Sequence, residues 1–311
     1  MGVLSRLWFA MRTRNIEDAG TDDRIQLIIK EDGVEKLNFT FPDTSQDDQE
    51  RGKANLYQLG PIVLRPENLT DSSFNVAIKG KDFWFPEHVL IWAEADKRVV
   101  PLAAEWDIEA GISTDPTEGR SSFPVRRIGY PISPIIQAPD SQARIRQLLV
   151  ILTTANVEDA GTPDDVVIKI THSGGRKLNP IHIRTLSMKE LKTGQAFFSL
   201  PSTEAPVLPG TPLPRWNNLE SVDLEIEGDE AWLPSSFSIL GFTGPYGDPD
   251  PQGTPKGPKP RSIMPLIHIP KWNLGTLSRD RDEGKPSVSL PLLPIPTFQP
   301  FPLNVARPKR S

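Results

Sequence analysis

The stretch NIEDAGTDD at residues 15–23 decides the fold, because a close copy of it, NVEDAGTPDD, returns at residues 156–165. The pentapeptide EDAGT begins at residue 17 and again at residue 158, an offset of 158 − 17 = 141. The tripeptide KLN at residues 36–38 returns at residues 177–179 with the same offset. A repeat of this kind indicates one structural unit that is present twice.

Two further sequence blocks follow in the same order in both copies. The second block, Gly-x-x-x-Trp-x-Pro, lies at residues 80–86 and again at 228–234, an offset of 228 − 80 = 148. The third block contains Glu-Gly at residues 118–119 and 283–284, an offset of 283 − 118 = 165. The second copy therefore carries about 165 − 148 = 17 extra residues. We assign them to residues 244–261, whose Pro, Gly, Asp and Lys are typical of a surface loop.

The three blocks predict two domains and two extended segments. The domains span residues 4–130 and 145–292, a proline-containing linker spans 131–144, and a proline-rich tail spans 293–311. A chain of 311 residues is long enough for two domains that each bury a core. Because each domain contains all three blocks, we expect each of them to fold on its own.

Composition and periodicity predict an all-β protein. The chain has 33 prolines and 22 glycines, which oppose long helices and favour short strands joined by turns. In each copy a β-branched run, a glycine turn and a second run indicate a hairpin, and alternating segments indicate half-buried strands. The expected strands are residues 25–30, 74–78 and 89–93 in the first copy and 166–171, 222–226 and 237–241 in the second. Only residues 140–149 have a tolerable helical period. We therefore predict two tandem antiparallel β-sandwiches of about six to eight strands each.

The composition disfavours several classes of function. The absence of cysteine excludes disulfides and thiolate metal sites. A net charge of -5 and a pI near 5.5 disfavour nucleic-acid binding, which needs a basic surface. No apolar run approaches the roughly 20 residues of a transmembrane helix, and the first residues lack a signal-peptide core. We therefore expect a cytoplasmic protein, with attachment to the periphery of a membrane as the alternative location.

The sequence offers no recognisable catalytic motif. It lacks the Gly-x-Ser-x-Gly elbow, the phosphate-binding P-loop and the dinucleotide-binding Gly-x-Gly-x-x-Gly. The four histidines, His88, His172, His182 and His268, form no His-x-x-x-His pair, and each occurs in one copy alone. We therefore expect the histidines to be surface or hydrogen-bonded residues, and the chain not to be an enzyme.

The first two blocks of each copy resemble the PLAT domain, also called LH2. That family joins an acidic Ala-Gly-Thr-Asp turn and a β-branched strand to a later pair of strands with a tryptophan. The carriers are residues 17–29 and 78–85 in the first copy and 158–170 and 226–233 in the second. The resemblance implies an eight-stranded sandwich that docks onto a membrane or a protein partner, often with calcium, while any chemistry lies in another domain. It leaves the third block of each copy unassigned.

The resemblance also implies calcium ligands, because the family binds calcium in the acidic turn and in the loop before the tryptophan. Carboxylate and carbonyl oxygens are the ligands that calcium prefers. The matching residues are Asp18, Gly20, Asp22, Asp23 and Asp82 in the first copy and Asp159, Gly161, Asp164, Asp229 and Glu230 in the second. The second copy is the better candidate, because the cation of Lys81 adjoins Asp82 in the first. A tight turn without a metal is the alternative, since Asp and Gly both suit such turns.

Trp84 and Trp232 occupy equivalent positions in the two copies, and we expect core packing there rather than contact with a membrane. Taken together, these features predict a non-enzymatic binding or adaptor protein that engages a protein partner or a membrane surface, with calcium as its one candidate cofactor. The alternative is a structural subunit of a larger assembly, whose proline-rich segments contact neighbouring subunits.

Overall fold

A computed structural model describes residues 4, 6–42, 49–65, 68–95, 98–106, 108–127, 145, 147–183, 196–199, 215–242 and 263–293. In these ranges the regular structure is β-strand, apart from 3-10 turns at Asn68 and at Trp216–Asn218 (η3). The strands form antiparallel sheets, which confirms the predicted all-β sandwich class. The predicted linker, the insertion at 244–261 and the tail beyond Leu293 lie outside the described residues. No helix in the described part of the chain is long and apolar enough to cross a bilayer.

The first sandwich contains strands β1 to β8. An outer sheet has the order β3-β2-β5-β8, and β4, β1, β6 and β7 lie opposite it in an inner sheet. The strands are β1 (Arg6–Thr13), β2 (Arg24–Glu31), β3 (Val34–Thr40), β4 (Ala54–Leu59), β5 (Phe74–Lys79), β6 (Pro86–Ala95), β7 (Arg98–Trp106) and β8 (Ser122–Pro124). The predicted hairpin is β2–β3, and Asp32 and Gly33 form its turn with φ values of 50° and 77°.

The second sandwich contains strands β9 to β17. Its outer sheet has the order β11-β10-β14-β17, with β12 also paired to β10, and its inner strands are β13, β9, β15 and β16. The strands are β9 (Gln147–Thr154), β10 (Val166–His172), β11 (Arg176–Lys177), β12 (Ile181–His182), β13 (Ala196–Ser199), β14 (Leu219–Ile226), β15 (Pro234–Phe242), β16 (Ile263–Ile269) and β17 (Ser287–Leu290). The second predicted hairpin is β10–β11.

The helical period proposed for residues 140–149 is wrong where the structure describes it, because residues 147–149 open strand β9. Leu148 faces the core of the second sandwich, whereas Leu149 faces the opposite side of the sheet and is equally buried. A strand that is buried on both faces reads as a continuous apolar run, and such a run cannot be distinguished from a buried helix by its period alone.

Each sandwich has its own core, built by alternate residues of facing strands. In the first sandwich Leu27 of β2 and Val76 of β5 belong to one buried cluster with Phe9 of β1 and Ile91 of β6. A second cluster fills the other sandwich in the same way, from residues between Ile145 and Leu290. The period-2 pattern of the outer strands, apolar inward and polar outward, is what places these side chains between the sheets.

The equivalent tryptophans lie in these two cores, as predicted. Trp84 and Trp232 are both 0% exposed. The indole Nε1 of Trp84 donates to Thr13 Oγ1 at 2.9 Å, and that of Trp232 donates to Thr154 Oγ1 at 3.0 Å. The two threonines are themselves equivalent, at the offset of 154 − 13 = 141. Core packing of the tryptophans is therefore confirmed in both copies.

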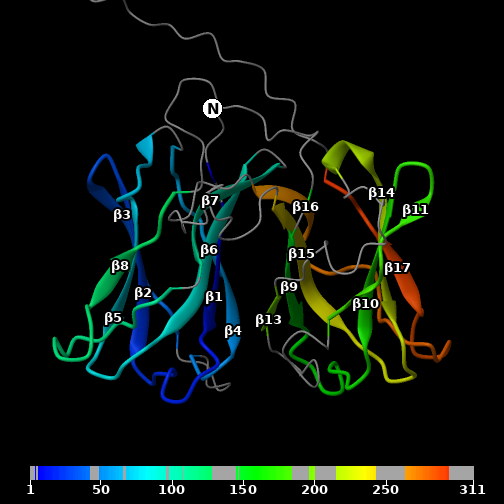
Figure 1. Cartoon of the computed structure of the whole chain (residues 1–311), viewed down its shortest axis with the longest axis horizontal. Helices are drawn as coiled ribbons and strands as arrows, with labels where there is room; N and C mark the ends of the chain where they lie inside the picture. Colours follow the sequence, from blue (N-terminus) through cyan, green and yellow to red (C-terminus); the bar gives the residue numbers. More distant parts are fainter. Residues whose placement is uncertain are drawn as a thin grey trace, which may run out of the picture.

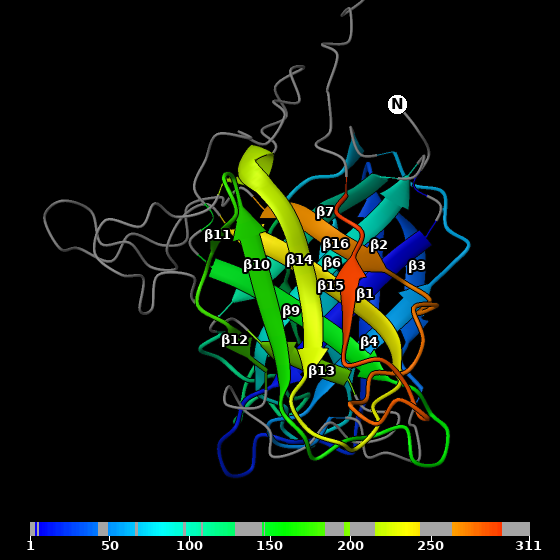
Figure 2. The same cartoon turned by 90° about the vertical axis from the view of Figure 1, so that its right-hand side faces the viewer.

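The two sandwiches stand side by side as four layers of sheet (Figure 1). The two inner sheets form one eight-stranded sheet of order β16-β15-β9-β13-β4-β1-β6-β7, joined where Ala196 of β13 pairs with Ala54 of β4. At the other side β16 contacts β7, so this sheet folds back on itself. The view in Figure 2 looks onto the outer sheet of the second sandwich, with the inner sheets behind it.

A third buried cluster fills the space between the inner sheets. Its members come from both sandwiches: Trp8, Ala10, Leu90, Trp92, Val99, Ala104, Leu149, Ile151 and Leu240. The rings of Trp8 and Trp92 stack with centroids 6.1 Å apart. Strands β1, β6 and β9 are therefore buried on both faces, which explains their uninterrupted apolar sequences.

A polar network borders this cluster and also joins the two sandwiches. The Glu94 carboxylate accepts from Trp8 Nε1 at 2.8 Å and lies 3.1 Å from Nε2 of His268. Burial holds the pKa of His268 below its usual value, although the hydrogen bond to Glu94 and the charge of that carboxylate act in the opposite direction. A neutral imidazole then donates from Nε2 to Glu94 and accepts at Nδ1 from the hydroxyl of Ser238, 2.9 Å away.

Candidate functional site

The loops that carry the predicted calcium ligands lie at one end of the molecule. The β1–β2 and β9–β10 loops hold the two acidic turns, and the β5–β6 and β14–β15 loops contain the two matching glycines of the second block. Figure 1 places all four loops at the bottom of the view. We name this surface the loop end, defined by residues 14–23, 80–85, 155–165 and 227–233.

The acidic turns have the same backbone in both copies. Asp18 and Asp159 take left-handed φ values of 55° and 58°. The carbonyl of Ala19 accepts from the amide of Phe85 at 2.9 Å, and the carbonyl of Ala160 accepts from the amide of Leu233 at 3.0 Å. Aspartate tolerates this region better than most residues, because its short side chain bonds locally to the backbone. The Ala-Gly-Thr motif is therefore a turn that ties the first block to the second.

Two of the predicted calcium ligands act as hydrogen-bond acceptors for the neighbouring loop. The Asp23 carboxylate accepts from the amide of Asp82 at 2.6 Å, and the Asp164 carboxylate accepts from the amide of Glu230 at 2.8 Å. The amides of these two aspartates in turn donate to the hydroxyls of Thr21 and Thr162. A carboxylate that accepts from backbone amides orders a loop without any metal.

The glycine of the second block makes room for this carboxylate. A Cβ on Gly80 would lie 1.9 Å from the carboxyl group of Asp23, and a Cβ on Gly228 would lie 1.9 Å from that of Asp164. No carbon atom fits at that distance. The Gly of one block and the Asp of the other are therefore a matched pair in both copies.

Substituting Gly228 with alanine is expected to destabilise the second sandwich by about 1–3 kcal/mol, the cost of forcing an extra carbon into a packed site. Asp164→Ala should cost a similar amount, because it leaves the Glu230 amide without its acceptor. The double variant should cost less than the sum of the two, since the small side chain at position 164 removes the clash. Urea unfolding of the four proteins measures the cycle, and strictly additive costs would contradict the pairing.

The remaining predicted ligands lie on the surface of the same loops. The Asp82 carboxylate accepts from the amides of Asp22 and Phe83, at 3.1 and 3.0 Å. Asp229 and Glu230 are exposed. Gly20 packs against the backbone of residues 49–51, and Gly161 is partly buried. The ligand-bearing loops are thus brought together, but each described hydrogen bond of these carboxylates goes to a backbone amide.

The third block, which the resemblance left unassigned, completes this end of each sandwich. Ser113 Oγ donates to the Lys81 carbonyl at 2.8 Å, and Ser278 Oγ donates to the Asp229 carbonyl at 2.9 Å. The same hydroxyls accept from the amides of Asp115 and Asp280, two residues further on. The signal that could have found this pair is the constant offset, 278 − 113 = 165, which equals that of the Glu-Gly match.

Exposed aliphatic side chains occur at one equivalent position of the two acidic turns. Ile16 is 45% exposed and Val157 is 54% exposed, and their offset is 157 − 16 = 141. Acidic residues follow directly in both copies, Glu17 and Asp18 in the first. The loop end therefore presents the same pair of features twice, an aliphatic tip and an acidic flank.

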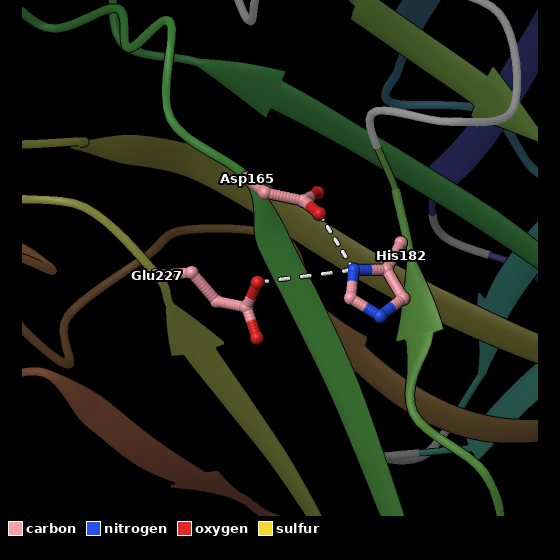
Figure 3. A group of neighbouring side chains, drawn as sticks. All are labelled: Asp165, His182 and Glu227. Atoms are coloured by element: carbon pink, nitrogen blue, oxygen red, sulfur yellow. Dashed lines mark hydrogen bonds and ion pairs between the residues drawn. The ribbon is translucent and has the colours of Figure 1, made fainter.

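One group of metal-ligating side chains was not anticipated from the sequence. Within the described ranges, the single set of three or more His, Asp or Glu residues close enough to share an ion is Asp165, His182 and Glu227 (Figure 3). None of the predicted calcium ligands belongs to it, and calcium binding in the acidic turns stays a prediction. The histidine expectation holds for His88, which is buried but hydrogen-bonded to the backbone of Glu87; burial and the nearby Arg12 and Arg14 lower its pKa to about 3. The expectation is wrong for His172, which is buried while its Nε2 has no hydrogen-bond partner among the described residues.

Comparisons with known proteins establish no family for the chain. No protein-family model matches it, and no curated protein matches it.

Among solved structures the chain is similar to the alpha toxin from Clostridium absonum, at 13% identity and a TM-score of 0.35. The match covers 50% of this chain and 34% of the toxin chain. The chain thus spans about a third of that toxin's length. It is also similar to a pair of C2 domains of extended-synaptotagmin 2, at 8% identity and a TM-score of 0.13, over 73% of this chain and 75% of that one. Likenesses at these TM-scores carry no functional conclusion, and what the structure itself shows is an all-β protein of two antiparallel sandwiches.

Proposed function

We propose that the chain is a non-enzymatic binding protein that docks through the loop end of two PLAT-like sandwiches onto a membrane or a protein partner. The observation that supports this most directly is the equivalent exposure of Ile16 and Val157 on that surface. An exposed aliphatic residue is ordinary by itself. An exposed aliphatic residue at the same position of both copies is less ordinary. Because the two loops point the same way (Figure 1), both residues can contact one surface.

Two equivalent tips on one rigid body favour simultaneous contact. The sandwiches share a buried interface, so their loop ends keep a fixed relation to each other. When the first tip binds, the second faces the same surface at a high effective concentration, and the combined affinity exceeds that of either tip alone. A flat, extended target such as a bilayer or a large protein suits this arrangement better than a small ligand.

The charge at the loop end restricts the target. The tips adjoin acidic side chains, Glu17 and Asp18 in one sandwich and Glu158 and Asp159 in the other, and all four are exposed. Such a surface repels an anionic bilayer. Docking there therefore needs either a basic protein surface or a divalent cation that bridges these carboxylates to lipid phosphates. Calcium in the second acidic turn would supply that bridge. The position that Lys81 occupies in the first copy is occupied there by Asp229, so no cation opposes the metal.

The double variant Ile16→Ser/Val157→Ser tests the proposal. Burying one such side chain contributes about 1.5–3 kcal/mol, so each loss should weaken binding at least tenfold. Sedimentation with phosphatidylserine vesicles, in calcium and in chelator, measures the membrane arm, and Asp159→Asn should remove the calcium dependence. Affinity capture from native extract measures the protein arm.

Val34→Ser is the matched control, because Val34 is an exposed aliphatic residue at the start of β3. The β2–β3 turn, which precedes it directly, lies at the opposite end of the first sandwich in Figure 1. Docking through the loop end expects Val34→Ser to leave binding unchanged, whereas the second candidate function, described next, expects it to weaken capture of a protein partner. Binding that the double variant retains in full, in either arm, would show that the loop end is not the contact surface.

The second candidate function, a structural subunit of a larger assembly, is favoured by a feature at that opposite end. Exposed Val34 and Val63 line a cavity of about 590 Å³ with Lys36 and Arg65. The second sandwich has Gly175 where the first has Val34, at the offset of 141. Contact surfaces at both ends would suit a chain that bridges its neighbours, and native size-exclusion chromatography distinguishes the functions, because a subunit migrates as a large, salt-stable complex.

A further inference from the structure

One imidazole and two carboxylates meet on the outer sheet of the second sandwich (Figure 3). Asp165 directly precedes β10, His182 is the last residue of β12, and Glu227 directly follows β14. Strands β12 and β14 pair with β10, and the register sets Val167 opposite His182 and Val166 opposite Ile226. Three segments far apart in the sequence are therefore held together by strand pairing.

The ligand atoms of this group lie close enough together for one small cation to bind all three residues. His182 Nδ1 lies 2.6 Å from Asp165 Oδ2 and 4.0 Å from Glu227 Oε2. Zinc bonds to nitrogen and oxygen are about 2.0–2.2 Å long, which sets the ligand atoms of a tetrahedral ion roughly 3.3–3.6 Å apart. All three ligand atoms lie within 4.8 Å of one another, so side-chain shifts of about 1 Å would reach that spacing. Asp165 and His182 are partly buried and Glu227 is exposed, so an ion and its water ligands have access.

An unsatisfied atom in the same group points to a ligand. Asp165 Oδ1 is buried and accepts no hydrogen bond from any described residue. A buried carboxylate oxygen that has lost its water without gaining a donor carries a desolvation cost, and such atoms are rare in folded proteins. The hydrogen bond to His182 satisfies the other oxygen alone. Oδ2 is the oxygen that faces His182, so a cation that both oxygens of Asp165 bind would satisfy Oδ1 as well.

We propose that Asp165, His182 and Glu227 bind a divalent transition-metal ion, with zinc as the representative, and that the ion fastens β12 and the end of β14 to β10. Imidazole nitrogen with carboxylate oxygen suits zinc and its first-row neighbours, whereas calcium takes oxygen ligands throughout. The site is separate from the acidic turn, where the neighbouring Asp164 carboxylate bonds to the Glu230 amide.

The first sandwich lacks the group at the equivalent place. In the first sandwich the strand register sets Arg24 opposite Lys79. It also sets Gln26, the counterpart of Val167, opposite Thr40, whereas in the second sandwich Val167 lies opposite His182. The counterparts of Asp165, His182 and Glu227 are thus Arg24, Thr40 and Lys79, two cations and a hydroxyl. The same fold forms without these ligands, so the shared architecture does not require them.

Isothermal titration of zinc into the full chain, with melting temperature as a second readout, tests the proposal. The wild type should bind one ion and melt at a higher temperature with zinc present, since a ligand that binds the folded state alone stabilises it. His182→Thr, which installs the residue of the first sandwich, should abolish both effects. Glu227→Gln, at an exposed position, should weaken binding at least tenfold and keeps the test informative if the first variant folds poorly.

Glu225→Gln is the matched control. Glu225 lies in β14 two residues from Glu227, but its carboxylate pairs with Lys169 and Arg279 instead of His182. It should leave zinc affinity unchanged. The absence of saturable binding in the wild type, or equal losses in Glu225→Gln and Glu227→Gln, would overturn the proposal and leave Asp165 and His182 as an ion pair. Neither result bears on docking by Ile16 and Val157.

Discussion

Replacing Trp84 or Trp232 with alanine is expected to destabilise the sandwich that contains it by about 3–5 kcal/mol. Both indoles are fully buried, so the substitution removes a large apolar surface and leaves a cavity that the rigid sheets cannot close. Each substitution also removes the indole N–H that donates to a buried threonine, Thr13 in the first sandwich and Thr154 in the second. Because these contacts are the same in both copies, the two variants should suffer similar losses.

Urea unfolding of the full-length variants measures these losses. Phenylalanine at the same positions keeps much of the volume and should cost clearly less than alanine. Trp272, which is partly exposed and donates to the Gly275 carbonyl, provides the control, and its alanine variant should be milder than the other two. A loss of vesicle or partner binding in Trp84→Ala without loss of stability would make the residue a surface contact after all.

The parts of the fold that depend on local sequence could be predicted. The hairpin turn at Asp32 and Gly33 requires left-handed backbone, which these residue types accept, and the outer strands alternate between core and solvent. The duplication then carried each prediction to the second copy, including the burial of Trp84 and Trp232. Such features follow from short segments and need no knowledge of what lies across the sheet.

The contact between the sandwiches could not be predicted in the same way. Residues 7–11, 89–93 and 148–152 are apolar without alternation, and a run of that kind indicates burial on both faces without naming the second partner. In the structure, one face of each strand packs within its own sandwich and the other packs against its neighbour. The partner of the second face is set by tertiary arrangement, which a linear pattern does not contain.

The candidate sites show the same division. The acidic turns were found because their residues are adjacent in the sequence and occur twice, although the structure gives Asp23 and Asp164 a role in ordering the next loop. Asp165, His182 and Glu227 were missed, because strand register brings them together across more than 60 residues and the first copy has no such set. A search for ligands at helical or loop spacing does not detect ligands that face one another across a sheet.

Placing a charge between the inner sheets is expected to separate the unfolding of the two sandwiches. Ala10 of β1 is fully buried in the cluster that joins them, and Ala10→Asp would put an unpaired carboxylate there at a cost of several kcal/mol. The chain can avoid this cost by opening the interface, because each sandwich keeps a core of its own. The destabilisation is therefore limited to the free energy of the interface itself, including the stack of Trp8 on Trp92.

Differential scanning calorimetry of the full chain follows this separation. The wild type should unfold in one transition, since melting either sandwich exposes the cluster that both share, whereas Ala10→Asp should unfold in two. Ala77→Asp, the same substitution on the outer face of β5, should keep a single transition, because its carboxylate can reach water. Two transitions in the wild type would mean that the interface contributes little to stability. One transition in Ala10→Asp at a lower temperature would instead mean that neither core holds without the other, and the expectation that each domain folds on its own would then be wrong.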